Sequence, residues 1–287
     1  MDNKSFIGDR IGKRDVSLAL LSGIGFFFVY LIFSPRGLDP SLWDEMTVAA
    51  GIRPPQTVFA GVWRLLTAWL LSLFGSAYII QTLRIIGAAI GGISTVFVYF
   101  VLRQILASLT RVKSFERWNW IAPLFATIAT VCFCAGDVMF RITAPVTPAA
   151  FRFLALILSL HFFLQFVKRG GLLRILVSMA FAGLLAAETL VGFLLPAIYY
   201  VVQRLALAEA LNEKQQVDAD PGHLAYMPRW RMFFSFVSGL VLLVGVNITA
   251  FVLFGGLEAN GWSGFDVTFH YVVKYYGFLA SAASPIG

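Results

Sequence analysis

Long apolar runs constrain the fold of this chain more than any other feature of its sequence. Several of them approach 20 residues, the length that an α-helix needs to cross the roughly 30 Å hydrocarbon core of a bilayer. Of the 287 residues, 59% are hydrophobic and 13% are charged, whereas a soluble domain carries about 25% charged residues. The sequence contains no series of ten-residue segments with alternating polarity, the pattern of a membrane β-barrel. It therefore predicts an all-α integral membrane protein.

The apolar runs predict about seven transmembrane helices. The run 58–74 is also long enough to cross, but Arg64 lies in its middle. Lys and Arg concentrate in cytoplasmic loops of membrane proteins, and the basic loop 103–119 lies on that side only if this run does not cross. We therefore expect 56–75 to be an interfacial amphipathic helix, with Arg64 on its polar side, in a first external loop over 34–80. The seven expected spans are 16–33, 81–102, 120–139, 146–167, 171–187, 189–203 and 232–257.

The distribution of basic residues predicts the orientation of these spans. The net charge of +7 would suggest a nucleic-acid partner in a soluble protein, but in a membrane protein it indicates a basic cytoplasmic surface. We expect a multi-pass protein of the bacterial inner membrane with a cytoplasmic N-terminus, the lipid bilayer as a partner and no nucleic acid. The four expected cytoplasmic segments hold 15 of the 22 basic residues, and they are 1–15, 103–119, 168–174 and 204–231.

The pattern of spans also predicts the domain organisation. Residues 1–257 form one expected transmembrane module, and 258–287 begin a further outer segment rich in aromatic residues. The odd number of spans and the apolar end suggest the N-terminal part of a longer protein. The two cysteines, Cys132 and Cys134, lie two apart in an apolar run, a spacing that turns them to different helix faces and favours core thiols over a disulfide or a zinc site.

Carboxylates gather on the predicted outer side. The stretch "LDPSLWDEMTVAAGIRPPQ", residues 38–56, holds Asp39, Asp44 and Glu45 directly after the first span. Acidic residues near hydrocarbon are costly, so they tend to face a water-filled cavity or carry function. Seven of the fifteen acids fall on the outer side or at outer helix ends: Asp39, Asp44, Glu45, Asp137, Glu188, Glu258 and Asp266.

Two interpretations of the acidic stretch stay open. Ser41 at a helix N-cap with Asp44 at the third helical position approaches a capping box, and both Asp44 and Glu45 then suit the positive end of the helix dipole. Alternatively, a carboxylate at the lipid–water boundary accepts the proton of a hydroxyl nucleophile. Asp44 could also hold a divalent cation, Mg²⁺ or Mn²⁺, that steadies a leaving phosphate.

Cations suited to phosphate lie on the same predicted side. Arginine presents a planar fork of donors that matches phosphate oxygens. The same side chains also reach lipid headgroups by extending along apolar surface, so each one has a simpler alternative role. The arginines at outer positions are Arg53, Arg84, Arg141 and Arg152.

Two short motifs carry a resemblance to a known superfamily. The order of span, acidic loop, Pro-Pro, interfacial helix and span is similar to the N-terminal module of the GT-C superfamily of polyprenyl-phosphate-sugar-dependent glycosyltransferases. The stretch "WDEMTVAAGIRPP" (43–55) resembles the acidic, Ala-rich, Gly-Ile…Pro-Pro element of the branch related to protein O-mannosyltransferases. The stretch "FAGLLAAETLVGFLLPAIYY" (181–200) resembles that branch's Gly-Leu…Leu-Pro-Ala block, with Glu188 where the family usually has His.

The resemblance, which covers about residues 16–257, implies an enzyme. It implies transfer of a sugar from a polyprenyl-phosphate donor to a protein, lipid or glycan acceptor on the non-cytoplasmic face. The family's Gly-Asp-Ser element is missing here, so either Asp44, the first candidate, or Asp39 takes the role of the catalytic acid, with Glu45 as a further candidate. Arg53 replaces the family's His before Pro-Pro, and Glu188 also replaces a His, which implies either altered acceptor chemistry or a diverged, inactive relative. The implied substrate-binding residues are Arg53, Arg84, Arg141, Arg152 and Glu188. The alternative function is a polytopic transporter or flippase for a lipid-linked or anionic substrate, in which buried acids and arginines line a path.

Overall fold

A computed structural model places most of the chain. It describes residues 12–33, 47–48, 50–55, 59–109, 121–136, 139–140, 148–189, 191–214, 229–261, 263–264 and 266–267.

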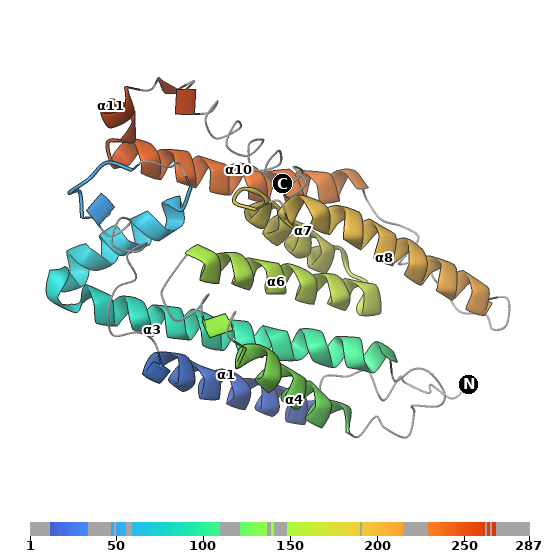
Figure 1. Cartoon of the computed structure of the whole chain (residues 1–287). Coiled ribbons are helices and arrows are strands. Elements are labelled where there is room, and N and C mark those ends of the chain that lie inside the picture. The colour runs from blue at the N-terminus through green and yellow to red at the C-terminus, as the bar shows by residue number, and fades with distance from the viewer. Residues whose placement is uncertain are drawn as a thin grey trace, which may run out of the picture. The chain divides into compact units, whose positions relative to one another are not determined.

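Every regular element in these ranges is a helix, as the apolar runs predicted (Figure 1). The helices are α1 (Lys13–Phe33), α3 (Gly61–Leu109), α4 (Ala122–Cys134), α6 (Pro148–Arg169), α7 (Leu172–Ala186), α8 (Val191–Lys214), α10 (Arg229–Leu253) and α11 (Gly256–Asn260).

Among the residues that the structure describes, four helices are long and apolar enough to cross a membrane. They cover Lys13–Phe33, Tyr78–Leu106, Ala149–Arg169 and Arg229–Leu253. Each coincides with one of the expected spans, which supports a multi-pass membrane protein. The other three expected spans correspond to shorter apolar helices, over Ala122–Cys134, Leu172–Ala186 and Val191–Leu205.

The described helices belong to two compact units. The first unit spans Met1–Gly37 and Leu83–Ser178, and α1 shows how its core forms. Its buried residues recur every three or four positions, so they share one face of the helix: Asp15, Ala19, Gly23, Phe26 and Tyr30. This face packs on α4, and the Tyr30 hydroxyl donates a hydrogen bond of 2.9 Å to the carbonyl oxygen of Cys134.

The second unit spans Leu38–Thr82 and Met179–Gly287. Within it, α7 and α10 approach so closely that only glycine fits at two positions. A Cβ on Gly183 would lie 2.0 Å from the carbonyl oxygen of Phe236, and one on Gly239 would lie 2.2 Å from that of Ala180. Small residues permit such backbone contact between helices in membrane proteins.

The helix predicted at the membrane surface is separated from the span that follows. Gly75 adopts φ 69° and ψ 174° inside α3, a conformation that glycine tolerates and that interrupts the helical hydrogen bonds. The first part of α3 therefore covers Gly61–Gly75, close to the expected 56–75.

The environment of Arg64 differs from the prediction. We expected Arg64 on the polar side of this helix, but its side chain is buried in the second unit with 1% of its surface exposed. Trp63 is equally buried, whereas Trp69 is 59% exposed. The face that carries Arg64 thus packs against protein.

Candidate functional site

The structure describes four of the eight predicted site residues. Arg53 and Glu188 belong to the second unit, and Arg84 and Arg152 belong to the first. The three candidate catalytic acids and one arginine lie outside the described residues: Asp39, Asp44, Glu45 and Arg141.

A tight turn between α7 and α8 positions Glu188. The amide of Glu188 donates to the carbonyl oxygen of Leu185 at 3.1 Å, and the Thr189 amide donates to the same oxygen at 2.8 Å. A Cβ on Gly192 would lie 2.1 Å from the backbone nitrogen of Ala186, so glycine is required for α8 to start this close to the end of α7. The two helices thus form a hairpin with a half-buried carboxylate at its tip.

The carboxylate of Glu188 meets the start of α3. Its Oε1 accepts hydrogen bonds of 3.3 Å from the backbone N–H of Ala60 and of 3.3 Å from Nδ2 of Asn247. The Oδ1 of Asn247 accepts a bond of 2.8 Å from the N–H of Gly61. The first N–H groups of a helix have no partner within the helix and favour a negative charge, so Glu188 and Asn247 together cap this helix.

Backbone geometry at the start of α3 depends on this cap. Ala60 has a positive φ of 64°, which is unusual for a residue with a side chain. A Cβ on Gly61 would lie 2.6 Å from Cα of Asn247, so the start of the helix lies directly on α10. We refer to Glu188, Asn247, Ala60 and Gly61 as the Glu188 cap.

The Gly-Ile-Arg-Pro-Pro element of the first motif forms a defined turn in the same unit. Gly51 adopts a positive φ of 71°, and the amides of Ile52 and Arg53 donate to the carbonyl oxygen of Thr47 at 2.9 and 3.3 Å. Asn260 of α11 donates from Nδ2 to the carbonyl oxygen of Pro55 at 3.3 Å. The Arg53 side chain is exposed on this turn, where it is accessible to an anionic ligand.

Arg84 has a structural partner in the first unit. Its Nη2 donates a 3.1 Å hydrogen bond to the carbonyl oxygen of Leu31, in the last turn of α1. Carbonyls there have no partner within the helix and favour a positive charge. Arg152 lies half-buried on α6, so a role in phosphate binding stays a prediction for both residues.

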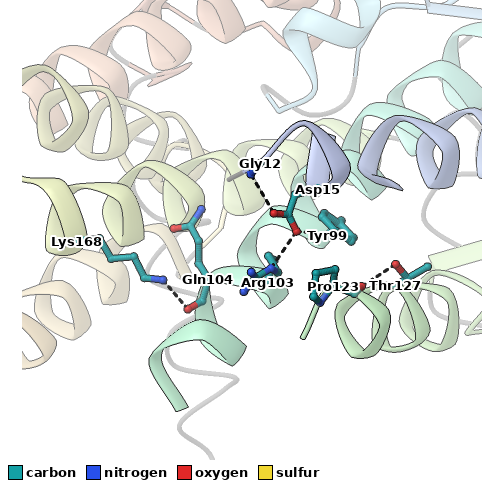
Figure 2. A network of polar contacts seen from close by, with 8 residues as sticks. All are labelled: Gly12, Asp15, Tyr99, Arg103, Gln104, Pro123, Thr127 and Lys168. Atoms are coloured by element: carbon teal, nitrogen blue, oxygen red, sulfur yellow. Dashed lines mark hydrogen bonds and ion pairs between the residues drawn. The ribbon is translucent and has the colours of Figure 1, made fainter. Parts of the chain in front are cut away.

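A second polar cluster, not foreseen from the sequence, lies in the first unit (Figure 2). Oδ1 of Asp15 accepts hydrogen bonds from the Tyr99 hydroxyl at 3.0 Å and from Nε of Arg103 at 2.9 Å. Oδ2 of Asp15 accepts a bond of 3.1 Å from the N–H of Gly12. A buried carboxylate needs such partners because its desolvation is costly, and here the network fastens the start of α1 to α3.

The neighbouring residue on α3 extends this polar region. Nε2 of Gln104 lies 3.1 Å from Nδ1 of His161 on α6, and Nε2 of Gln165 lies 2.7 Å from Nε2 of the same ring. A neutral imidazole donates from one nitrogen and accepts at the other, so one of the two amides presents its oxygen to the ring. Lys168 donates from Nζ to the carbonyl oxygen of Gln104 at 2.8 Å (Figure 2).

The residues of the Glu188 cap determine which ligands it can bind. The Glu188 cap combines a half-buried carboxylate with the start of a helix, and the carboxylate can accept a further hydrogen bond from a hydroxyl close to apolar helices. The described ranges contain no group of three His, Cys, Asp or Glu side chains that could hold a metal ion, and the predicted ligand Asp44 lies outside them.

Asn247 and Asp15 are among the residues of these clusters that the sequence reasoning missed. Asn247 interrupts the apolar run of α10, and Asp15 directly precedes the first expected span, 16–33. A polar residue inside a membrane helix is itself a reason to expect a specific partner. The sequence therefore indicated that these residues have partners, but it did not identify them.

Comparison of the chain with protein-family models, with curated proteins and with solved structures finds no match.

Proposed function

We propose that this protein is a membrane glycosyltransferase of the GT-C type. It transfers a sugar from a polyprenyl-phosphate donor to a protein, lipid or glycan acceptor on the non-cytoplasmic face. The proposal includes seven spans, with the three shorter apolar helices crossing as well, and a cytoplasmic N-terminus.

The Glu188 cap is the observation that carries this proposal. It fixes a carboxylate at the tip of a helix hairpin, on α10 and at the start of the helix Gly61–Gly75. The compact unit that contains the cap also contains the turn that bears Arg53. Both sequence motifs that resemble the superfamily thus contribute ordered polar groups to one unit, which supports a shared substrate site.

The reaction needs three functions from the chain. The acceptor hydroxyl oxygen attacks the anomeric carbon, the bond from that carbon to the donor phosphate oxygen breaks, and the hydroxyl proton passes to a carboxylate. Asp44 is the proposed base, with Asp39 and Glu45 as alternatives. Arg53 supplies positive charge to the departing phosphate, and Glu188 accepts hydrogen bonds from sugar or acceptor hydroxyls.

The test uses the purified full chain with polyprenyl-phosphate-mannose as the donor. We expect release of polyprenyl phosphate, and we expect Asp44→Asn to lower this rate by about a hundredfold or more, the scale of losing a general base. Asp39→Asn and Glu45→Gln, at matched expression, serve as comparisons. If Asp39→Asn alone abolishes release, the base lies five residues upstream. If all three variants retain full activity, the acidic stretch is a helix cap and the catalytic assignment is wrong.

One observation favours the alternative of a transporter or flippase. Ionisable and polar side chains inside membrane helices often mark a path for ions or substrate, and Asp15, Arg103 and His161 lie within the candidate spans of the first unit. Reconstituted protein that moves a lipid-linked sugar across a vesicle membrane without releasing polyprenyl phosphate would establish transport in place of transfer.

A further inference from the structure

A group of arginine and aromatic side chains lies where α8 and α10 approach each other in the second unit. The guanidinium carbon of Arg204 lies 5.2 Å from the ring centre of Tyr200, and that of Arg229 lies 6.0 Å from the same ring. Nε of Arg204 also donates a 3.0 Å hydrogen bond to the Tyr200 hydroxyl. On α10, the guanidinium carbon of Arg231 lies 5.1 Å from the ring centre of Trp230. We call these five residues the arginine–aromatic cluster.

The cluster concentrates positive charge that the described protein does not neutralise. Arg204, Arg229 and Arg231 are exposed, and among the residues that the structure describes none of them forms an ion pair with a carboxylate. Two guanidiniums share one tyrosine ring, although like charges repel. A bound anion would relieve this repulsion, because guanidinium groups match phosphate oxygens in shape and charge.

The surroundings of the cluster are apolar and exposed. Trp230, Phe233 and Phe234 are 62%, 63% and 60% exposed on α10, and Leu205 is 65% exposed on α8. Tryptophan prefers the level of lipid headgroups, where its ring stays in an apolar layer while its N–H remains hydrated. The ligand therefore has to combine an anionic group with hydrocarbon, as a phospholipid does.

The position of the cluster along the helices agrees with the thickness of a membrane. Glu188 contacts Asn247, Phe193 contacts Phe236, and Tyr200 contacts Arg229, so α8 and α10 run antiparallel. Asn247 follows Arg229 by 18 residues, which in a helix corresponds to about 27 Å. That length is close to the roughly 30 Å of a hydrocarbon core, so the Glu188 cap and the arginine–aromatic cluster lie near opposite surfaces of the bilayer.

We propose that the arginine–aromatic cluster binds the phosphate headgroup of an anionic phospholipid. Arg204 and Arg229 contact the phosphate, Tyr200 holds both side chains in place, and the exposed aromatic residues of α10 contact the acyl chains. In the predicted orientation this surface is cytoplasmic, the side of a membrane on which basic segments bind anionic lipid. The proposal does not depend on glycosyl transfer, because the cluster lies at the other end of the hairpin from Glu188.

The test measures lipid bound to the detergent-purified full chain by native mass spectrometry. With equal amounts of phosphatidylglycerol and phosphatidylcholine, we expect preferential retention of phosphatidylglycerol. Arg204→Gln combined with Arg229→Gln should lower the bound-to-free ratio of phosphatidylglycerol about 25-fold, since each basic residue near anionic lipid contributes about fivefold. The single variant Arg14→Gln, which removes an exposed charge from α1, should keep the preference.

Substitutions of Tyr200 distinguish a specific lipid-binding site from a general effect of net charge on lipid binding. Tyr200→Leu leaves the net charge unchanged, so a severalfold loss of phosphatidylglycerol supports the proposed geometry, and Tyr200→Phe should retain most of the binding. Equal binding of both lipids by the unmodified protein would overturn the proposal, as would an equal loss in Arg14→Gln. If inorganic phosphate at millimolar concentration displaces the lipid completely, the site takes free phosphate and the assignment to a lipid is wrong.

Discussion

At the scale of single residues, the buried polar groups fix contacts between helices that apolar packing alone does not specify. Asp15 and Arg103 form a buried ion pair, with 7% and 11% of their side-chain surfaces exposed. Removing one member leaves the other charged and unpaired, which in a protein interior costs more than the pair itself contributes. The pair therefore determines which way the start of α1 can lie on α3.

We expect Asp15→Ala to lower the free energy of unfolding by about 3 kcal/mol or more. Tyr99→Phe removes one hydrogen bond to the same carboxylate and should cost about 1 kcal/mol. Ser17→Ala, at an exposed position on the same helix, is the matched control and should have little effect. Thermal unfolding of the detergent-solubilised protein, followed by tryptophan fluorescence, gives the order of the three. Equal midpoints for Asp15→Ala and Ser17→Ala would show that the ion pair does not hold α1.

Variants of Glu188 and Asn247 distinguish the contribution of the cap to stability from the proposed role of Glu188 in substrate binding. Asn247→Ala removes the acceptor for the Gly61 N–H and should cost about 1–3 kcal/mol, the penalty for a buried donor without a partner. Glu188→Gln keeps an oxygen that accepts from Ala60, so its unfolding midpoint should change much less. If Glu188 binds substrate through its charge, this variant should still lose polyprenyl phosphate release. A stable and fully active Glu188→Gln protein would restrict the residue to capping.

At the scale of helices, the close contact between α1 and α3 depends on two glycines. A Cβ on Gly23 would lie 2.9 Å from the carbonyl oxygen of Gly92, and one on Gly92 would lie 2.8 Å from that of Gly23. A Cβ on Gly23 would also lie 2.4 Å from Cγ2 of Val96. The two carbonyl oxygens are backbone atoms, which cannot move aside as a flexible side chain does, so the two glycines permit close contact between the main chains of the helices.

Gly23→Ala and Gly92→Ala should each destabilise the first unit by about 1–3 kcal/mol, because an added methyl forces the helices apart. Gly25 lies on the same helix with no atom within 4 Å of an added Cβ. Gly25→Ala should therefore be neutral or slightly stabilising, since alanine favours helix by about 1 kcal/mol over glycine. Unfolding midpoints of the three variants provide the comparison, and a loss in Gly25→Ala equal to that in Gly92→Ala would contradict the contact.

The helices themselves were predictable from the sequence, because a long apolar run in a membrane has to form an α-helix to satisfy its backbone hydrogen bonds. The first expected span, 16–33, corresponds to α1 over Lys13–Phe33, and 146–167 corresponds to α6 over Pro148–Arg169. The helix expected over 56–75 and the span expected over 81–102 lie on either side of the non-helical Gly75, although the residue at the break was not predicted. The pairing of Gly61 with Asn247 was not predictable, since it joins residues 186 positions apart and depends on how helices pack.

At the scale of the whole molecule, the number of spans depends on whether the shorter apolar helices cross the membrane. The helix Ala122–Cys134 has 13 residues and α7 has 15, lengths of about 20 and 22 Å that fall short of a hydrocarbon core. A shorter helix can still cross where the bilayer thins or the flanking residues reach the interface. Charge is therefore a better guide than length, and the basic segments favour seven spans over four.

Labelling of single cysteines from outside distinguishes the two arrangements. With a cytoplasmic N-terminus, both arrangements place Ser41 outside and Ser114 inside, so cysteines at these positions calibrate the assay. Gln215 decides between them, because it follows α8 and lies inside with seven spans but outside with four. In a Cys132→Ser background, which removes the exposed native thiol, we expect an impermeant maleimide to label Ser41→Cys in intact cells. Ser114→Cys and Gln215→Cys should react only after the cells are permeabilised. Labelling of Gln215→Cys in intact cells would show that the protein has four spans and that the arginine–aromatic cluster lies at the outer leaflet. Labelling of Ser114→Cys in intact cells would show that the whole chain has the opposite orientation.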